Sequence, residues 1–148
     1  MQIDIILRRS LKMADGNDFK AKVTSLLDTP NTTSSYDKDD IEKNKVLCIF
    51  AYLSWLVIIP ILAAKDSKFA KFHSNQGLVL FLVSLVWGVI YGVLAFILHF
   101  IPVLGAILIA LLSLVHLVYL ALIILGIVNV LNGEAKELPI IGKIRILK

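Results

Sequence analysis

Two long stretches of the sequence carry no formal charge, and they limit the possible folds more than any other feature. Residues 46–64 and 78–131 contain no Asp, Glu, Lys or Arg. An α-helix rises 1.5 Å per residue and the hydrocarbon core of a bilayer is about 30 Å thick, so roughly 20 apolar residues make one crossing. The first stretch therefore predicts one membrane span. The second is too long for one crossing and too short for three, so it predicts a hairpin of two helices.

The hairpin has one suitable place to turn, in residues 99–105. This segment contains Pro102, which disfavours helical backbone at the residue before it, and Gly105, which relaxes the backbone. We expect spans at about 46–64, 78–100 and 103–131. The predicted fold class is an all-α membrane protein with about three transmembrane helices, arranged as a helix, an interfacial loop and a helical hairpin after a polar N-terminal tail.

Composition excludes several functional classes. Hydrophobic residues make up 58% of the chain, more than the 45–50% typical of soluble domains. The single cysteine, Cys48, excludes an internal disulfide framework and a Cys-cluster metal site. No nucleophile–base pair, phosphate-binding glycine loop or metal-ligand set is present. We therefore expect neither an enzyme nor a bound cofactor or metal, and the formal charge of +4 indicates a membrane surface rather than nucleic acid as partner.

The predicted domain boundary lies where the first span begins. Residues 1–45 are expected to form a polar, partly disordered tail, and residues 46–148 a helical membrane domain. Residues 1–12 resemble neither a tail nor an anchor, and Met13 is a second candidate for the first residue of the protein. One short amphipathic helix is expected in the tail, because apolar residues recur there at helical spacing: Phe19, Val23, Leu26 and Leu27.

Orientation is predicted from Lys and Arg close to the spans. The first loop and the C-terminal tail together carry more of these residues than the 20 residues before the first span. This count favours the loop and the C-terminal tail in the cytoplasm and the N-terminus outside. The expected location is the plasma membrane of a prokaryote, crossed several times.

The segment 67–78, SKFAKFHSNQGL, is the most informative short motif. Two interpretations stay open. In one, its lysines meet anionic headgroups and its polar residues mark where the second span leaves the interface. In the other, His73, Asn75 and Gln76 line a polar mouth of the helical bundle that receives a partner protein or a passing polypeptide.

A second polar group lies near mid-membrane. His116 falls at the middle of the third span, and Tyr91 should lie at similar depth in the antiparallel second span. Ionisable residues inside a membrane are candidates for function. The alternative is that the two side chains form a polar contact that holds the helices together.

Small residues recur at every fourth position in the second span and line the third span, a pattern that favours close helix packing within the hairpin or between two copies of the chain. They are Ser84, Gly88, Gly92, Ala106 and Ala110.

Four short motifs together resemble a known family. They are F-H-S-N-Q-G-L at 72–78, I-P-V-L-G at 101–105, N-V-L-N-G-E at 129–134 and L-P-I-I-G at 138–142. Over roughly residues 45–148 the chain resembles bacterial membrane proteins of unknown function that are related to the Tic-twenty component of the chloroplast import translocon. The resemblance implies a helical membrane protein and, for the plastid relatives, a place in a polypeptide-conducting complex.

The sequence thus favours a non-enzymatic membrane component that acts as an assembly or translocation partner. Two alternatives stay open: a small oligomeric transporter or channel around His116, and an immunity-type protein against a membrane-active peptide. The expected partners are the lipid bilayer and either another membrane protein or further copies of this chain.

Overall fold

The computed structural model describes residues 16–147, without the side chains of residues 16–18. The candidate start at Met13 and residues 1–12 lie outside the described residues. The chain divides into two compact units, residues 1–30 and 31–148. The described elements are α2 (Gly16–Leu27), η1 (Thr33–Ser35), α3 (Lys38–Ile49), η2 (Phe50–Tyr52), η3 (Ser54–Val57), α4 (Ile58–Ala63), α5 (Lys68–Leu98) and α6 (Leu104–Leu131). The predicted all-α fold class is confirmed.

The first unit contains the helix α2, where an amphipathic helix was expected in the tail. Its apolar side chains at Phe19, Leu26 and Leu27 are exposed. The hydroxyl groups of Thr24 and Ser25 donate hydrogen bonds to carbonyls of the preceding turn, at 2.8 Å each.

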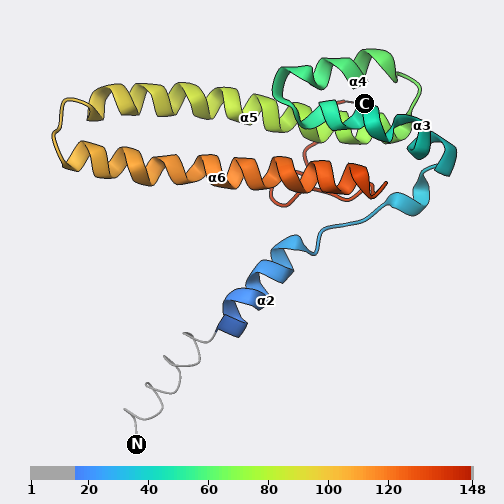
Figure 1. Cartoon of the computed structure of the whole chain (residues 1–148), viewed down its shortest axis with the longest axis horizontal. Helices are drawn as coiled ribbons and strands as arrows, with labels where there is room; N and C mark the ends of the chain where they lie inside the picture. The colour runs from blue at the N-terminus through green and yellow to red at the C-terminus, as the bar shows by residue number, and fades with distance from the viewer. Residues whose placement is uncertain (1–15, 148) are drawn as a thin grey trace, which may run out of the picture. The chain divides into compact units, whose positions relative to one another are not determined.

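In the second unit, α5 and α6 form a long antiparallel hairpin (Figure 1). Their 31 and 28 residues correspond to about 46 and 42 Å of helix, and both helices are long and apolar enough to cross a membrane. The turn lies where the sequence predicts it. Val103 has a positive φ of 63°, and Gly105 packs so closely against the end of α5 that a Cβ there would lie 1.9 Å from the Leu98 carbonyl oxygen.

The second unit has two parts with different surroundings. Residues 81–98 and 104–121, which we call the hairpin arms, contain no buried residue except Gly105. Large apolar side chains such as Val89 and Phe96 are more than two-thirds exposed there. Each arm is about 27 Å long, close to the hydrocarbon thickness of a bilayer. The arms therefore have the length and the apolar surface that lipid requires.

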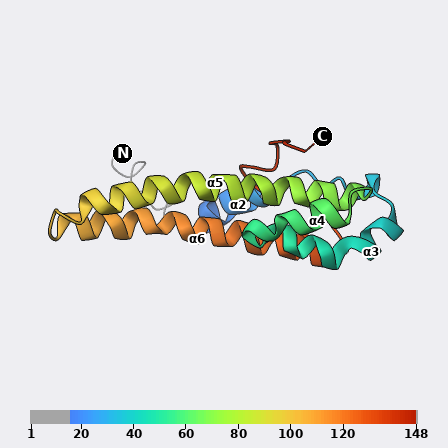
Figure 2. The ribbon, with the colours of Figure 1, turned by 90° about the horizontal axis from the view of Figure 1, so that it is seen from above.

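Residues 31–80 and 122–147 form the other part, which we call the basal bundle. Every buried residue of the hydrophobic core lies in it. The helices α3 and α4 pack against the first turns of α5, and the C-terminal segment runs along α5 as well (Figure 2).

The segment expected as the first span, residues 46–64, is not one continuous helix. Helix α3 ends at Ile49, two 3-10 turns follow, and α4 begins at Ile58. Ser54 has a left-handed backbone (φ 56°), and at this point the chain reverses, so that α4 runs back beside α3 (Figure 1). Within this segment Ala51, Tyr52 and Val57 are buried in the basal bundle. The segment therefore does not expose all its sides, as a helix surrounded by lipid would.

The helix that contains the second expected span starts earlier than predicted. Helix α5 begins at Lys68 instead of about residue 78. The reason is local, because the Ser67 side chain caps the helix by accepting a hydrogen bond from the Ala70 N–H at 2.9 Å. The motif at 72–78 therefore lies inside a helix and not at its start.

Close helix packing occurs at glycines other than those expected. A Cβ at Gly77 would lie 1.8 Å from the Ala51 carbonyl oxygen, and one at Gly126 would lie 2.3 Å from the Tyr52 ring. By contrast, a Cβ at Gly88 or Gly92 would meet no atom within 4 Å.

The other members of the small-residue pattern differ in burial. Ala106 and Ala110 are exposed. The hydroxyl of the half-buried Ser84 donates to the Phe81 carbonyl of its own helix at 2.7 Å. The expected zipper within the hairpin is therefore corrected: Gly88 and Gly92 face open space, whereas Gly77 and Gly126 of the basal bundle are approached closely by a 3-10 turn and an aromatic ring.

The reversal at Ser54 predicts the sidedness of the chain. In a Cys48→Ser background, single cysteines at Lys38, Asp66 and Asn132 should react with an impermeant thiol reagent from the same side of sealed vesicles. A cysteine at His99, in the hairpin turn, should react from the opposite side. Reaction of the Lys38 and Asp66 positions from opposite sides would show that residues 46–64 cross the membrane after all.

The glycine contacts predict which small residues matter for stability. Gly77→Ala and Gly126→Ala should each lower the free energy of unfolding by about 1–3 kcal/mol or more, because the added methyl group overlaps atoms of Ala51 or Tyr52. Gly88→Ala is the matched control and should leave stability unchanged or slightly raised. The measurement is the unfolding midpoint of each variant in the same detergent, and equal midpoints for all three variants would contradict the contact.

Candidate functional site

The most distinctive site is the polar motif in the first turns of α5. His73, Asn75 and Gln76 are between 0 and 2% exposed. Elements α3, η2, α4 and α6 pack around this end of α5. Because buried polar side chains are costly unless they are hydrogen-bonded, the partners of these residues determine what the motif does.

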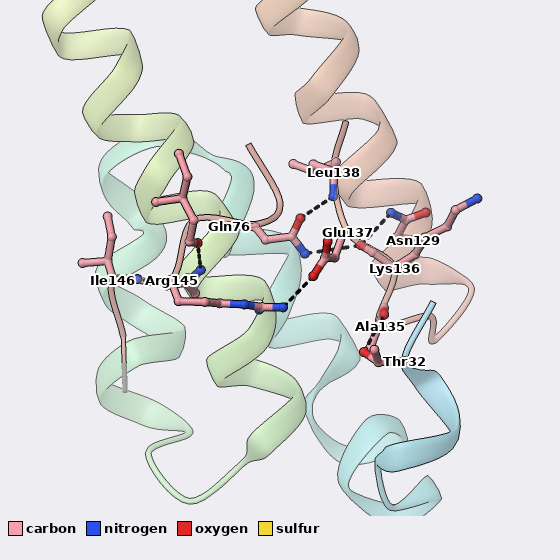
Figure 3. A network of polar contacts seen from close by, with 11 residues as sticks. Thr32, Gln76, Asn129, Ala135, Lys136, Glu137, Leu138, Arg145 and Ile146 are labelled. Atoms are coloured by element: carbon pink, nitrogen blue, oxygen red, sulfur yellow. Dashed lines mark hydrogen bonds and ion pairs between the residues drawn. The ribbon is translucent and has the colours of Figure 1, made fainter. Parts of the chain in front are cut away.

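Gln76 binds the backbone of the C-terminal segment with both ends of its amide. Its Oε1 accepts a hydrogen bond from the Leu138 N–H at 2.6 Å, and its Nε2 donates to the Lys136 carbonyl at 3.3 Å. Figure 3 shows both contacts. The Nδ2 of Asn129, on α6, donates to the same Lys136 carbonyl at 3.4 Å. The Gln76 amide thus pairs with two residues of an extended segment much as a neighbouring strand would.

Asn75 binds the same segment further along the chain. Its Nδ2 donates to the Ile144 carbonyl at 2.6 Å, and its Oδ1 accepts from the N–H groups of Ile146 and Leu147 at 2.6 and 2.9 Å. Between the two contacts, Arg145 forms an ion pair with Glu137 at 2.8 Å (Figure 3). Asn75 and Gln76, which we call the tail clamp, therefore fix residues 136–147 against α5.

His73 connects the motif to the reversing segment. Its Nδ1 lies 2.8 Å from the Tyr52 hydroxyl, within hydrogen-bond distance. Its ring also packs edge-on against Phe69 and Phe72, with centroids 4.6 and 5.1 Å apart. Since the Tyr52 ring lies against Gly126 of α6, this hydrogen bond joins η2, α5 and α6.

Residues 31–33 attach to the same C-terminal segment. The Thr32 N–H donates to the Ala135 carbonyl at 2.9 Å, and the Ala135 N–H donates to the Thr33 hydroxyl at 2.8 Å. The Thr32 hydroxyl also donates to the Ala135 carbonyl, at 3.1 Å (Figure 3). The C-terminal segment is therefore held between the start of the second unit and α5.

Asp40 of α3 lies beside the N-terminus of α5. Its carboxylate accepts a hydrogen bond from the Phe69 N–H at 3.1 Å and another from the Asn44 amide at 2.9 Å. Partial burial raises the pKa of this carboxyl, but hydrogen bonds from Ser67, Phe69, Asn44 and Lys68 outweigh it and bring the pKa below its ordinary value. Asp40 is therefore ionised at neutral pH, where its negative charge favours the N-terminus of α5.

The structure corrects the polar mouth expected at His73, Asn75 and Gln76. These side chains are brought together on one helix, but they are buried and bonded within the chain, so they are not presented to a partner. The physical reason is that the backbone groups of the C-terminal segment need hydrogen-bond partners. The side-chain amides of Asn75 and Gln76 supply them.

His116 and Tyr91 are brought together as expected, with ring centroids 4.9 Å apart. Their hydrogen bonds, however, go to a third residue. The Tyr91 hydroxyl lies 2.9 Å from the Ser113 hydroxyl, and the His116 Nδ1 lies 3.3 Å from the Ser113 carbonyl oxygen. The His116 side chain is exposed on the surface of the arms.

Sequence reasoning missed Tyr52, Asn129 and the extended C-terminal segment as parts of this site. Charged and apolar residues alternate at Lys143, Ile144, Arg145 and Ile146, a pattern typical of extended backbone, which needs hydrogen-bond partners outside its own segment. No spacing in the sequence connects Tyr52 with His73, because the reversal at Ser54 is what brings them together.

Comparison with known proteins gives two findings. The sequence model of the magnetosome magnetite crystal formation protein family matches residues 43–147. Residues of the chain are also 38% identical over 63 positions to the magnetosome protein MmsF of Paramagnetospirillum magneticum. That alignment covers 43% of this chain and 51% of the relative, so it spans about half of the relative's length. No solved structure matches the chain.

The family match overturns the resemblance to Tic-twenty-like proteins. All four motifs that carried the resemblance lie within the matched residues 43–147, so the part of the chain that resembled Tic-twenty-like proteins matches the magnetosome family instead. Short polar motifs between long apolar helices are weak identifiers, because the helices themselves carry little sequence information.

The tail clamp predicts a specific effect of substitution. Gln76→Leu should leave the Leu138 N–H without its partner, at about 1–3 kcal/mol for this buried group, and the Lys136 carbonyl with only the longer hydrogen bond from Asn129. Residues 136–147 should then detach, and trypsin should cleave after Lys143 faster than in the unchanged protein. Asn132→Ala, at an exposed asparagine, is the control. Equal cleavage rates in both variants would contradict the clamp.

Proposed function

Because the chain belongs to the magnetosome magnetite crystal formation protein family, we propose that it is a non-enzymatic membrane component of magnetite crystal formation that acts through its basal bundle. The proposed location is the membrane that bounds the growing crystal, with the hairpin arms in the lipid and the basal bundle at one surface.

The observation that carries this proposal is the separation of charge along the hairpin. Between Lys71 and Glu134 the sequence has no Asp, Glu, Lys or Arg. All charged side chains described in residues 31–147 therefore belong to the basal bundle, and the arms and their turn have none. Contacts with dissolved ions, a mineral surface or charged proteins are accordingly available at one end of the hairpin only.

The tail clamp supports a structural role for that end. It fixes the C-terminal segment, which carries Lys136, Lys143 and Arg145, against the first turns of α5. A surface whose charged residues are held in place by buried hydrogen bonds loses little conformational entropy when it binds. The basal bundle is thus built as a rigid charged surface at the end of a membrane anchor.

The transport and immunity hypotheses stay predictions from the sequence, because no described contact tests them. The same is true of assembly with further copies of this chain or with another membrane protein. The proposal needs none of them.

The test is replacement in a magnetosome-forming bacterium that lacks its own member of the family. We expect the unchanged chain to restore the size and shape of the magnetite crystals seen by electron microscopy. The Asn75→Leu/Gln76→Leu double variant should fail to do so, because it releases the charged C-terminal segment. Gly88→Ala, which changes a position facing open space, should restore the crystals fully.

Two measurements make the result decisive. Immunoblots of the membrane fraction establish that the variants are present in equal amount. If the unchanged chain is present in that fraction and the crystals do not change in number, size or shape, the proposed role is wrong.

A further inference from the structure

Two adjoining cavities open beside the first turns of α5. The larger, of about 350 Å³, is lined by residues that include Tyr36, Lys68, Phe72 and Arg145. The smaller, of about 90 Å³, is lined by residues that include Pro60, Ile61, Lys65 and Ser74. Lys71 and Leu147 line both cavities, so the two lie side by side at the first turns of α5.

The lining is positively charged. Lys65, Lys68, Lys71 and Arg145 contribute four cationic groups, and the described lining of the two cavities includes no carboxylate. Lys65 and Lys68 also border a separate, open pocket whose lining includes four aspartates. Lys71 does not border that pocket, and within residues 16–147 it takes part in no ion pair. Lys71 is exposed and lines both adjoining cavities, so its ammonium group is available to a ligand there.

The hydroxyl group of Ser74 is buried and lines the smaller cavity. Ser74 is 1% exposed, and among the described residues its Oγ has no hydrogen-bond partner. Buried polar atoms without a partner are rare in folded proteins, and an absent ligand is one of the recognised reasons. Ser74 lines the smaller cavity together with Lys65 and Lys71, so a ligand there would meet one hydroxyl and two ammonium groups.

The backbone N–H groups in the first turn of α5 are not available to bind this ligand. The N–H groups of Phe69 and Ala70 are bonded to Asp40 and Ser67, and the Lys71 N–H donates to the Ser67 carbonyl. The site therefore depends on side chains, which can be exchanged one at a time.

The remaining walls are apolar. Pro60, Ile61 and Leu147 line the smaller cavity, and Tyr36 and Phe72 line the larger one. The Arg145 guanidinium lies over the Phe72 ring, 5.1 Å from its centroid, so this cation is held at the site by the ring and by Glu137. A ligand that fits must carry an anionic group and tolerate apolar surface beside it.

We propose that the two adjoining cavities bind a phosphate group, contacted by Ser74 and Lys71 and flanked by Lys65, Lys68 and Arg145. A phosphate offers several acceptor oxygens to a hydroxyl and to ammonium groups. It can be the headgroup phosphate of an anionic phospholipid, whose glycerol and first methylenes would lie on the apolar walls, or it can be free inorganic phosphate.

The experiment uses the full-length chain in a neutral detergent, with the variants Lys71→Gln and Ser74→Ala. Lys38→Gln and Ser84→Ala are the matched controls, because neither residue lines either cavity. Native mass spectrometry measures retention of phosphatidylglycerol against phosphatidylcholine, and calorimetry measures binding of inorganic phosphate.

We expect preferential retention of phosphatidylglycerol, weakened about fivefold by Lys71→Gln and by a similar factor in Ser74→Ala, with both controls unchanged. Thermal melting without lipid should be unaffected in all four variants, which separates loss of ligand from loss of fold. Binding of inorganic phosphate that depends on the same two residues, without retention of phosphatidylglycerol, would support the phosphate site and assign it to free phosphate. Equal loss in Lys71→Gln and Lys38→Gln, or no binding of either probe, would overturn the proposal.

Discussion

The basal bundle depends on the pairing of two side-chain amides with backbone groups of the non-helical C-terminal segment. Asn75 and Gln76 bind five backbone groups of residues 136–147 from the buried face of α5. Inside a protein, neither the amides nor the backbone could be left without partners, since each unpaired group would cost free energy. The C-terminal segment and the first turns of α5 therefore have to be buried together, and the motif is better understood as internal structure than as an exposed recognition surface.

The same constraint explains why the chain divides into two kinds of surroundings. The hairpin arms satisfy their backbone internally as helices and can offer apolar side chains to lipid on the sides that do not face the other arm. The basal bundle contains extended and 3-10 segments, whose backbone needs partners, so it gathers the polar residues and all the described charges of residues 31–147. Glycine follows this division: Gly77 and Gly126 admit Ala51 and Tyr52, whereas Gly88 and Gly92 face open space.

The proposed function uses the end of the hairpin where the charges lie. Membership of the magnetosome magnetite crystal formation family relates the chain to crystal formation. The tail clamp holds the C-terminal segment at this end in place. The lysine-lined cavities near Ser74 add a second property, because a bound phosphate would neutralise part of the positive charge at this end. Anchoring in lipid and presentation of a charged surface would then be coupled through the first turns of α5.

The sequence by itself determined the all-α class, the hairpin of two long apolar helices and its turn near Pro102, because missing charges and helix length are local properties of the chain. It also singled out His73, Asn75 and Gln76. Only the tertiary structure decided that residues 46–64 reverse at Ser54, that Tyr52 reaches His73 and that residues 136–147 bind the motif. These contacts join positions up to 72 residues apart, and the helical periodicity of an apolar sequence does not record which distant backbone groups will need a partner.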